Sequence, residues 1–219
     1  MSEHIVERKP RPRDRVMIRL SGGRFFALPE EAAAALAVGA ELSDEEIERL
    51  AGLDAYLRGR DKALRMLAIR GRSRREIDDA LRALGVGDAV RRGIVSELEE
   101  KGLIDDARFA REFVSVKKDV RRMGPHRLRA DLKKLGVGRT DLEDALASFG
   151  ADEQERLARA LAERATRSGT IDEKMVRRVA SMLTRKGFDY GVVNRIAADL
   201  ARRMERGPDD TEWAAPDDM

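Results

Sequence analysis

The chain has 219 residues, of which 42% are apolar and 39% are charged, and it contains no cysteine. The apolar share is sufficient for a hydrophobic core, which excludes a disordered polyelectrolyte, and the lack of cysteine excludes disulfides and thiolate chemistry. The longest uncharged run near the amino end, 32–40, is about half of the roughly 18 to 20 residues needed to cross a bilayer. The start, 1–10, lacks the apolar core of a secretory signal, so we expect a cytoplasmic protein.

The formal net charge of +3 hides a strong segregation of charge along the chain. Residues 29–56 carry eight acids and one base, 60–75 carry seven bases and one acid, and 106–136 carry ten bases and four acids. Segregated charge of this kind favours a polyanionic or acidic partner.

The first elements in chain order are strands and short helices. Residues 1–14 contain two prolines and scattered charges, which predict a flexible arm. Alternating apolar residues on both sides of "SGG" predict a β-hairpin. Two acidic helices are expected at 29–38 and 43–57, the second opening with a capping box, so that 15–59 forms an amino-terminal region.

Three helical repeats are predicted after residue 60. Gly85, Gly136 and Gly187 are spaced 51 residues apart, and the apolar positions around them keep the same spacing. Each glycine is expected just past a helix, in the left-handed conformation. The sequence therefore predicts a mainly α fold, a curved, solenoid-like array of three three-helix repeats with an amino-terminal hairpin and short helices. The repeats occupy 60–105, 106–150 and 151–206, and an acidic flexible tail follows at 207–219. The predicted helices are 61–69, 73–84, 88–100, 106–122, 125–135, 141–149, 152–167, 172–186 and 189–204.

Several polar residues are assigned to helix caps rather than to chemistry. Ser73 and Thr140 each precede a glutamate at capping-box spacing. Asp105 is expected to cap the helix that starts at Asp106, since adjacent side chains diverge and no third acid, histidine or cysteine nearby completes a metal site. His4 and His126 have no metal-site spacing, and "GVGDAV" lacks the third glycine and the lysine of nucleotide loops. We expect no metal, no cofactor and no enzyme activity.

Basic residues recur at the equivalent helix junction of the first two repeats and predict a binding face. Stacked repeats place equivalent positions along one side of an array. Such a face could bind nucleic-acid phosphates or an acidic protein surface, and a plain solvated surface is the third possibility. The candidate residues are Arg70, Arg72, Arg74, Arg75, Lys117, Lys118, Arg121, Arg122, Arg127, Lys133 and Lys134.

Three segments together resemble a known family. "RSRREIDDALRALGV", "LEEKGLIDDARFAREFV" and "GPHRLRADLKKLGV" are similar, in this order, to the RecX regulatory proteins of bacteria, and the resemblance covers roughly 61–200. It implies a modulator, usually an inhibitor, of the RecA recombinase, which binds in the groove of the RecA filament on DNA. Its restraint of strand exchange, ATP hydrolysis and coprotease action would place the chain in DNA recombination, DNA repair and the SOS response.

Two features depart from the family pattern. The third repeat has "TIDEKMVRRVASMLTRKGF" in place of the arginine-rich opening, and the acidic tail is not a family hallmark. We expect a monomer that binds RecA through the basic face of repeats one and two. The alternative is an autonomous basic nucleic-acid-binding protein that does not depend on RecA. Whether the basic face contacts RecA, single- or double-stranded DNA, or both is open, as is the role of the hairpin.

Overall fold

The structure of the chain, a computed structural model, describes residues 2–12, 14–167 and 169–206. The chain divides into two compact units, with the boundary between Asp105 and Asp106. The predicted junction of the first and second repeats falls at the same place. The acidic tail predicted at 207–219 lies outside the described residues.

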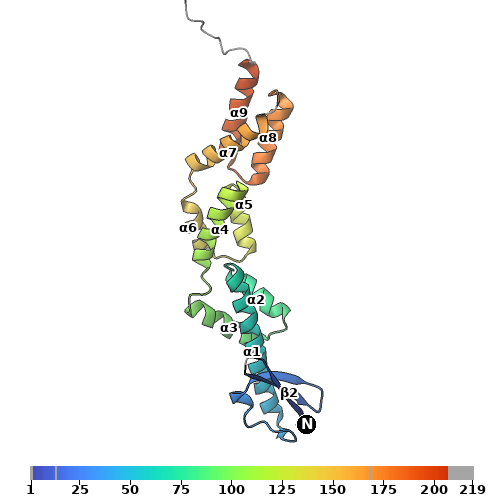
Figure 1. Cartoon of the computed structure of the whole chain (residues 1–219). Coiled ribbons are helices and arrows are strands. Elements are labelled where there is room, and N and C mark those ends of the chain that lie inside the picture. The colour runs from blue at the N-terminus through green and yellow to red at the C-terminus, as the bar shows by residue number, and fades with distance from the viewer. Residues whose placement is uncertain (1, 13, 168, 207–219) are drawn as a thin grey trace, which may run out of the picture. The chain divides into compact units, whose positions relative to one another are not determined.

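The amino-terminal unit begins with an antiparallel sheet (Figure 1). Its strands, in the spatial order β3-β2-β1-β4, are β1 (Glu3–Arg11), β2 (Arg15–Leu20), β3 (Phe25–Pro29) and β4 (Glu41–Leu42). Strands β2 and β3 form the predicted hairpin. Along β2, Val16, Ile18 and Leu20 are at most 1% exposed and alternate with half-buried or exposed residues, because successive side chains of a strand point to opposite faces.

The predicted flexible arm at 1–14 is wrong for residues 3–11, which form β1. Ile5 is fully buried, whereas Glu7 pairs with the neighbouring strand β2: Arg19 Nε donates to Glu7 Oε2 at 2.8 Å. A strand with one solvated face contains few apolar residues. Its composition therefore resembles that of a disordered segment, which explains the error.

The predicted helix at 29–38 is also wrong, since only the 3₁₀ turn η1 (Glu31–Ala33) forms there. The chain that follows bonds to β1 instead of continuing a helix. Ile5 N donates to Ala40 O at 3.0 Å, and Gly39 N donates to Ile5 O at 2.8 Å. Gly39 makes this turn with a φ of 89°, a conformation that favours glycine.

Helix α1 (Asp44–Ile69) is continuous across the domain boundary predicted between residues 59 and 60. That boundary is wrong, because the helices predicted at 43–57 and 61–69 are one element. The first part of α1 packs on the sheet, and its later part shares a second core with α2 (Arg74–Ala83) and α3 (Asp88–Glu100). Gly59 lies at the second core, where a Cβ would come within 2.7 Å of Ile94 Cδ1.

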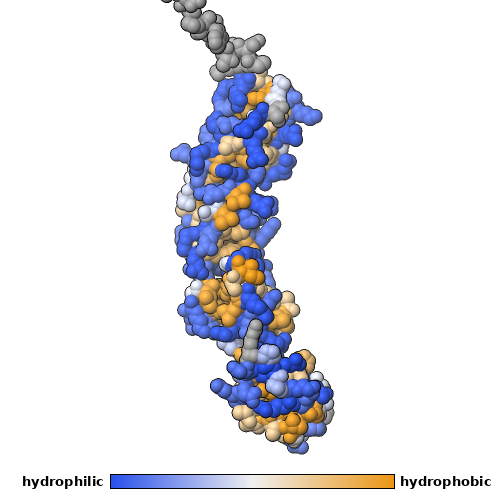
Figure 2. Space-filling model, viewed as in Figure 1, coloured by the Kyte–Doolittle hydropathy of each residue, from blue (hydrophilic) through white to orange (hydrophobic). Residues whose placement is uncertain are grey.

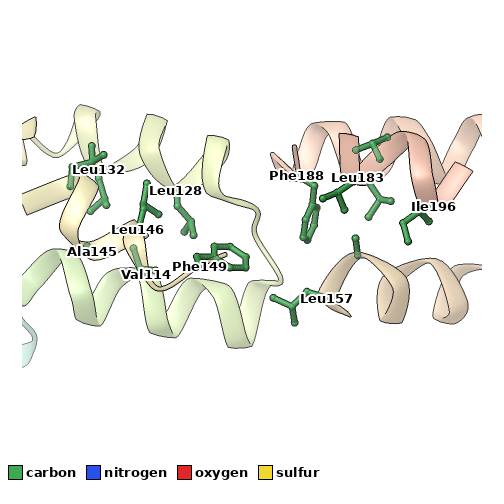
Figure 3. Close-up of a cluster of buried hydrophobic side chains, with 14 of the residues drawn as sticks. Val114, Leu128, Leu132, Ala145, Leu146, Phe149, Leu157, Leu183, Phe188 and Ile196 are labelled. Carbon is green, nitrogen blue, oxygen red and sulfur yellow. The ribbon is translucent and has the colours of Figure 1, made fainter. Parts of the chain in front are cut away.

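The second unit contains the helices of the second and third repeats. They are α4 (Asp106–Arg121), α5 (Pro125–Lys134), α6 (Arg139–Ala147), α7 (Ala151–Thr166), α8 (Glu173–Lys186) and α9 (Tyr190–Arg206). Their buried side chains form one continuous core. Figure 3 shows Leu128 and Leu146 gathered beside Val114 in repeat two, and Leu183 and Phe188 in repeat three. The mainly helical fold with three-helix repeats is confirmed.

The repeat glycines have the backbone conformation that the sequence predicts. The φ angles of Gly85, Gly136 and Gly187 are 78°, 79° and 86°, so each helix preceding them ends in a left-handed residue. The regular spacing therefore marks a real structural period.

The predicted caps have three different outcomes. Ser73 is confirmed: its hydroxyl accepts from Glu76 N at 3.2 Å, and Glu76 Oε2 accepts from Ser73 N at 3.2 Å. Thr140 is wrong, because α6 begins at Arg139 and Gly138 is its N-cap. Asp105 directly precedes the first residue of α4, and its capping bond stays a prediction.

Candidate functional site

The four basic residues predicted in repeat one lie around the start of α2, but acids of the same repeat partly neutralise them. Arg70 and Arg72 both contact Glu76 Oε1, at 2.7 and 3.0 Å. Burial works to raise the pKa of Glu76, but the hydrogen bonds from these arginines and from Ser73 N outweigh it and hold that pKa below 4.5. Glu76 therefore stays ionised and offsets the positive charge around it.

The other two arginines of this group also pair within the repeat. Arg74 lies 3.1 Å from Glu99, and Arg75 lies 3.6 Å from Asp79. The structure thus brings the four predicted residues together, as expected, but as the positive halves of ion pairs. A neutralised pair attracts an acidic partner much less than an unpaired cation does.

Lys118 does not lie on an outward basic face. Its ammonium is 2.9 Å from Glu153 Oε1 at the start of α7 and 5.7 Å from the centre of the Phe149 ring, and its side chain is only 17% exposed. It therefore holds α4 against the third repeat, and its place on the predicted face is corrected. Lys117, its neighbour, lies 5.5 Å from the centre of the Phe113 ring.

Repeats two and three meet at a close backbone crossing, which we call the joint. Gly124 N donates to Lys186 O at 2.8 Å, and His126 N donates to Gly187 O at 3.0 Å. A Cβ at Gly124 would lie 2.3 Å from Gly187 O, and a Cβ at Gly187 would lie 2.3 Å from Arg127 N. Both glycines are therefore required by the crossing itself.

Four cations flank the joint, and we call them the joint cluster. Arg121 is the last residue of helix α4 and Arg122 follows it on one side, and Arg185 and Lys186 end helix α8 on the other. The Lys186 ammonium donates to Arg121 O at 2.8 Å, which ties the two helix ends together. Among the described residues, none of the four has a carboxylate within ion-pair distance.

The acids Asp119, Asp131 and Asp189 lie near the joint, and none of them forms an ion pair with its four cations. Asp131 is 3.3 Å from Arg127, and Asp189 is 3.0 Å from His126 Nε2. Asp119 is exposed in the last turn of α4, two residues before Arg121, and forms no ion pair with the cluster. The joint cluster therefore keeps a net positive charge, with four cations and no ion pair among the described residues.

Two of these cations, Arg185 and Lys186, are absent from the predicted site. The repeat spacing could have found one of them, since Arg185 is 51 residues after the predicted Lys134. Lys133 and Lys134 themselves are exposed at the far end of α5, about 15 Å from the joint for a helix of its length. The structure thus unites Arg121, Arg122 and Arg127 with repeat three and leaves these lysines apart.

Part of the apolar face of α4 is exposed. Val116 and Val120 are 56% and 73% exposed, although their spacing in the sequence puts them on the same side of the helix as the buried Phe109. The core instead takes Phe109, Ala110 and Val114. Figure 2 shows apolar patches interrupting a mostly hydrophilic surface.

The described residues contain no group of three or more histidine and carboxylate side chains that could hold a metal ion. Within the same residues, none of the helices combines the length and the apolar composition that a membrane crossing requires.

Comparison with known proteins identifies the family of the chain. A family model described as "RecX, second three-helix domain" matches 105–146, and "RecX, third three-helix domain" matches 152–196. The regulatory protein RecX of Streptomyces lividans is 31% identical over 161 residues, which are 73% of this chain and 84% of that protein. The chain belongs to the RecX family.

Other RecX proteins extend the similarity over most of the chain. The regulatory protein RecX of Geobacillus kaustophilus (strain HTA426) is 33% identical over 170 residues, and the match covers 77% of this chain. The chain spans only 63% of the length of that RecX protein. A crystal structure of regulatory protein RecX matches 90% of this chain and 99% of its own, with a TM-score of 0.65 and 26% identity.

Proposed function

We propose that this RecX-family chain binds the RecA recombinase in its filament on DNA and inhibits its recombinase, ATPase and coprotease activities. The observation that carries the proposal is the similarity to regulatory proteins named RecX over most of the chain. The resemblance of its three sequence segments to the family supplies RecA as the partner.

The joint cluster is the part of the surface best suited to such a partner. Its cations have no carboxylate partner among the described residues, so their field extends to an approaching acidic or polyanionic surface. The arginines of repeat one are already paired with Glu76, Glu99 and Asp79. We therefore place the main electrostatic contact on repeats two and three and a smaller one on repeat one.

The test is the ATPase rate of RecA on single-stranded DNA, measured with and without the chain. We expect the rate to fall as the chain is added. The double substitution Arg185→Glu/Lys186→Glu should weaken this inhibition. Its matched control is Arg177→Glu/Arg178→Glu, which makes the same charge change at exposed positions of the same helix, about 12 Å away.

An unchanged ATPase rate, at stoichiometric excess of chain shown by circular dichroism to be folded, would overturn the proposal. Equal loss of inhibition in both double variants would instead reject the joint cluster as the contact. The alternative function is binding to nucleic acid without RecA. Retention of the chain on bare DNA, measured in the absence of RecA, distinguishes this function from the proposed one. The alternative predicts a salt dependence whose slope falls by about one for each phosphate-contacting cation removed.

A further inference from the structure

The sequence beyond helix α9 is chemically the opposite of the joint cluster. Residues 207–219 contain five acids and no lysine or arginine, and they include Trp213, the only tryptophan of the chain. The acids are Asp209, Asp210, Glu212, Asp217 and Asp218. This segment therefore has the charge that the joint cluster would attract.

The joint cluster can also hold an aromatic side chain. Arg121, Arg122 and Arg185 are exposed, and a guanidinium with no carboxylate partner can stack on an indole ring as well as pair with acids. A segment with acids on both sides of a tryptophan matches both properties of this surface. The chemistry therefore favours an acidic segment with an aromatic residue over an apolar one.

The attachment point of the segment is close enough for it to reach the cluster. Helix α9 begins at Tyr190, a few residues beyond the joint, and it packs along α8. Its 17 residues extend about 25 Å, whereas an extended chain of the length of 207–219 reaches about 40 Å. Trp213 is seven residues beyond Arg206 and reaches about 25 Å, so the part of the segment from Trp213 onward can fold back along α9 to the joint cluster of the same molecule.

We propose that residues 207–219 dock on the joint cluster of their own chain, with Asp217 and Asp218 beside the cations and Trp213 against an arginine. Because the segment is tethered, its effective concentration at the cluster is of millimolar order. It therefore competes with any acidic or polyanionic partner for this surface. The docking itself does not depend on the proposed function. Its consequence, that RecA or DNA has less access to the joint cluster, rests on that function.

Trp213 provides the test, because all tryptophan fluorescence of the full chain comes from this segment. Acrylamide, a neutral quencher, measures how accessible the indole is. At about 0.01 M salt, where the Debye length is about 30 Å, we expect weaker quenching than in a synthetic peptide of residues 207–219. At about 1 M salt, where the Debye length is about 3 Å, the protection should disappear.

Two variants locate the docking site. Arg185→Glu/Lys186→Glu should abolish the protection at low salt, whereas the control Arg177→Glu/Arg178→Glu should keep it. Quenching equal to that of the peptide at low salt would overturn the docking. If Trp213 stays protected in Arg185→Glu/Lys186→Glu, the joint cluster is not the docking site. If the protection grows with protein concentration, the segment docks on a second copy of the chain and not on its own.

The regulatory consequence has a separate readout. Removal of 207–219 should strengthen inhibition of the RecA ATPase, because the joint cluster is then permanently open. An unaltered inhibition by the shortened chain would reject the competition. Since the fluorescence test needs neither RecA nor DNA, failure of the docking and failure of the proposed function are distinguishable.

Discussion

At the residue scale, Arg122 has an unusual backbone for its side chain. Its φ is 51°, in the left-handed region, directly after the last residue of α4. This conformation costs roughly 1–2 kcal/mol for a residue with a Cβ, and glycine adopts it freely. The chain thus carries an arginine where helix-capping preferences alone would select glycine, at the edge of the joint cluster.

Replacement of Arg122 by glycine should separate stability from binding. We expect the free energy of unfolding in urea to stay the same or to rise by up to about 1 kcal/mol, while inhibition of the RecA ATPase weakens. The control is Arg111→Gly, an exposed position inside α4, which should cost about 1 kcal/mol in stability. A marked destabilisation by Arg122→Gly would contradict the strain at this residue.

The capping residues give a second prediction at this scale. Ser73 is fully buried and makes both bonds of a capping box, so Ser73→Ala should lower the free energy of unfolding by about 1 kcal/mol. Thr140 is an exposed residue inside the first turn of α6, so Thr140→Ala should change the free energy of unfolding by less than about 0.5 kcal/mol. Chemical denaturation followed by circular dichroism compares the two. Equal effects would mean that the caps are wrongly assigned.

At the scale of elements, α1 and α3 are joined by Glu97. Hydrogen bonds from Lys101, Tyr56 and Arg60 lower the pKa of this carboxyl from 4.5 to about 2, against the opposing effect of burial. Tyr56 and Arg60 lie on α1, whereas Glu97 lies on α3. The ionised carboxylate therefore stabilises the packing of these helices.

The lowered pKa of Glu97 predicts a pH dependence of the free energy of unfolding. Because the folded pKa lies below the unfolded one, the stabilisation is present above pH 4.5 and is lost as the pH falls toward 2. We expect Glu97→Gln, which cannot titrate, to lose less stability than the wild type over this window. Urea unfolding at a series of pH values measures the difference, and parallel pH profiles would exclude the role of Glu97.

The crossing of repeats two and three depends on Gly124. A Cβ there would lie within 2.3–2.4 Å of the backbone at 187–188, which cannot move aside as a flexible side chain can. We expect Gly124→Ala to lower the free energy of unfolding of the second unit by at least about 3 kcal/mol. Gly150 is also an N-cap glycine with extended backbone, but no atom lies within 4 Å of its Cβ position. Gly150→Ala should therefore cost only about 1 kcal/mol, the loss expected when alanine replaces a favourable N-cap residue.

At the scale of the whole molecule, each hydrophobic core belongs to one unit. The residues of one core all lie after Asp105, and those of the other two lie before it. A cavity made in one core should therefore be felt mainly by the helices that line it.

Leu128→Ala tests this separation. Leu128 is fully buried in the second unit, so its truncation should cost about 2–5 kcal/mol. We expect amide hydrogen exchange to accelerate in α4–α9 and to stay near the wild-type rate in α1–α3. Leu81→Ala, at a fully buried position in the first unit, should give the reverse pattern. Faster exchange in both units after either substitution would show that the cores are coupled.

The sequence by itself determined the helical repeats. Helix periodicity, the capping box at Ser73 and the left-handed glycines are local properties, since they depend on residues a few positions apart. The 51-residue spacing made them recognisable three times over. Strand β1 escaped prediction because its buried residues are few, and the long helix α1 because nothing local shows that it continues past residue 60.

Only the tertiary structure decided which cations form a surface. Lys186 and Arg121 are 65 positions apart, and no pattern in the sequence predicts that their helix ends meet. In the same way, the partners of Arg74 and Lys118, at Glu99 and Glu153, come from other helices. A charge is visible in the sequence, but its neutralisation depends on distance in the fold. The basic residues could thus be identified from the sequence. The joint that brings some of them together, and the ion pairs that neutralise others, could not be predicted from it.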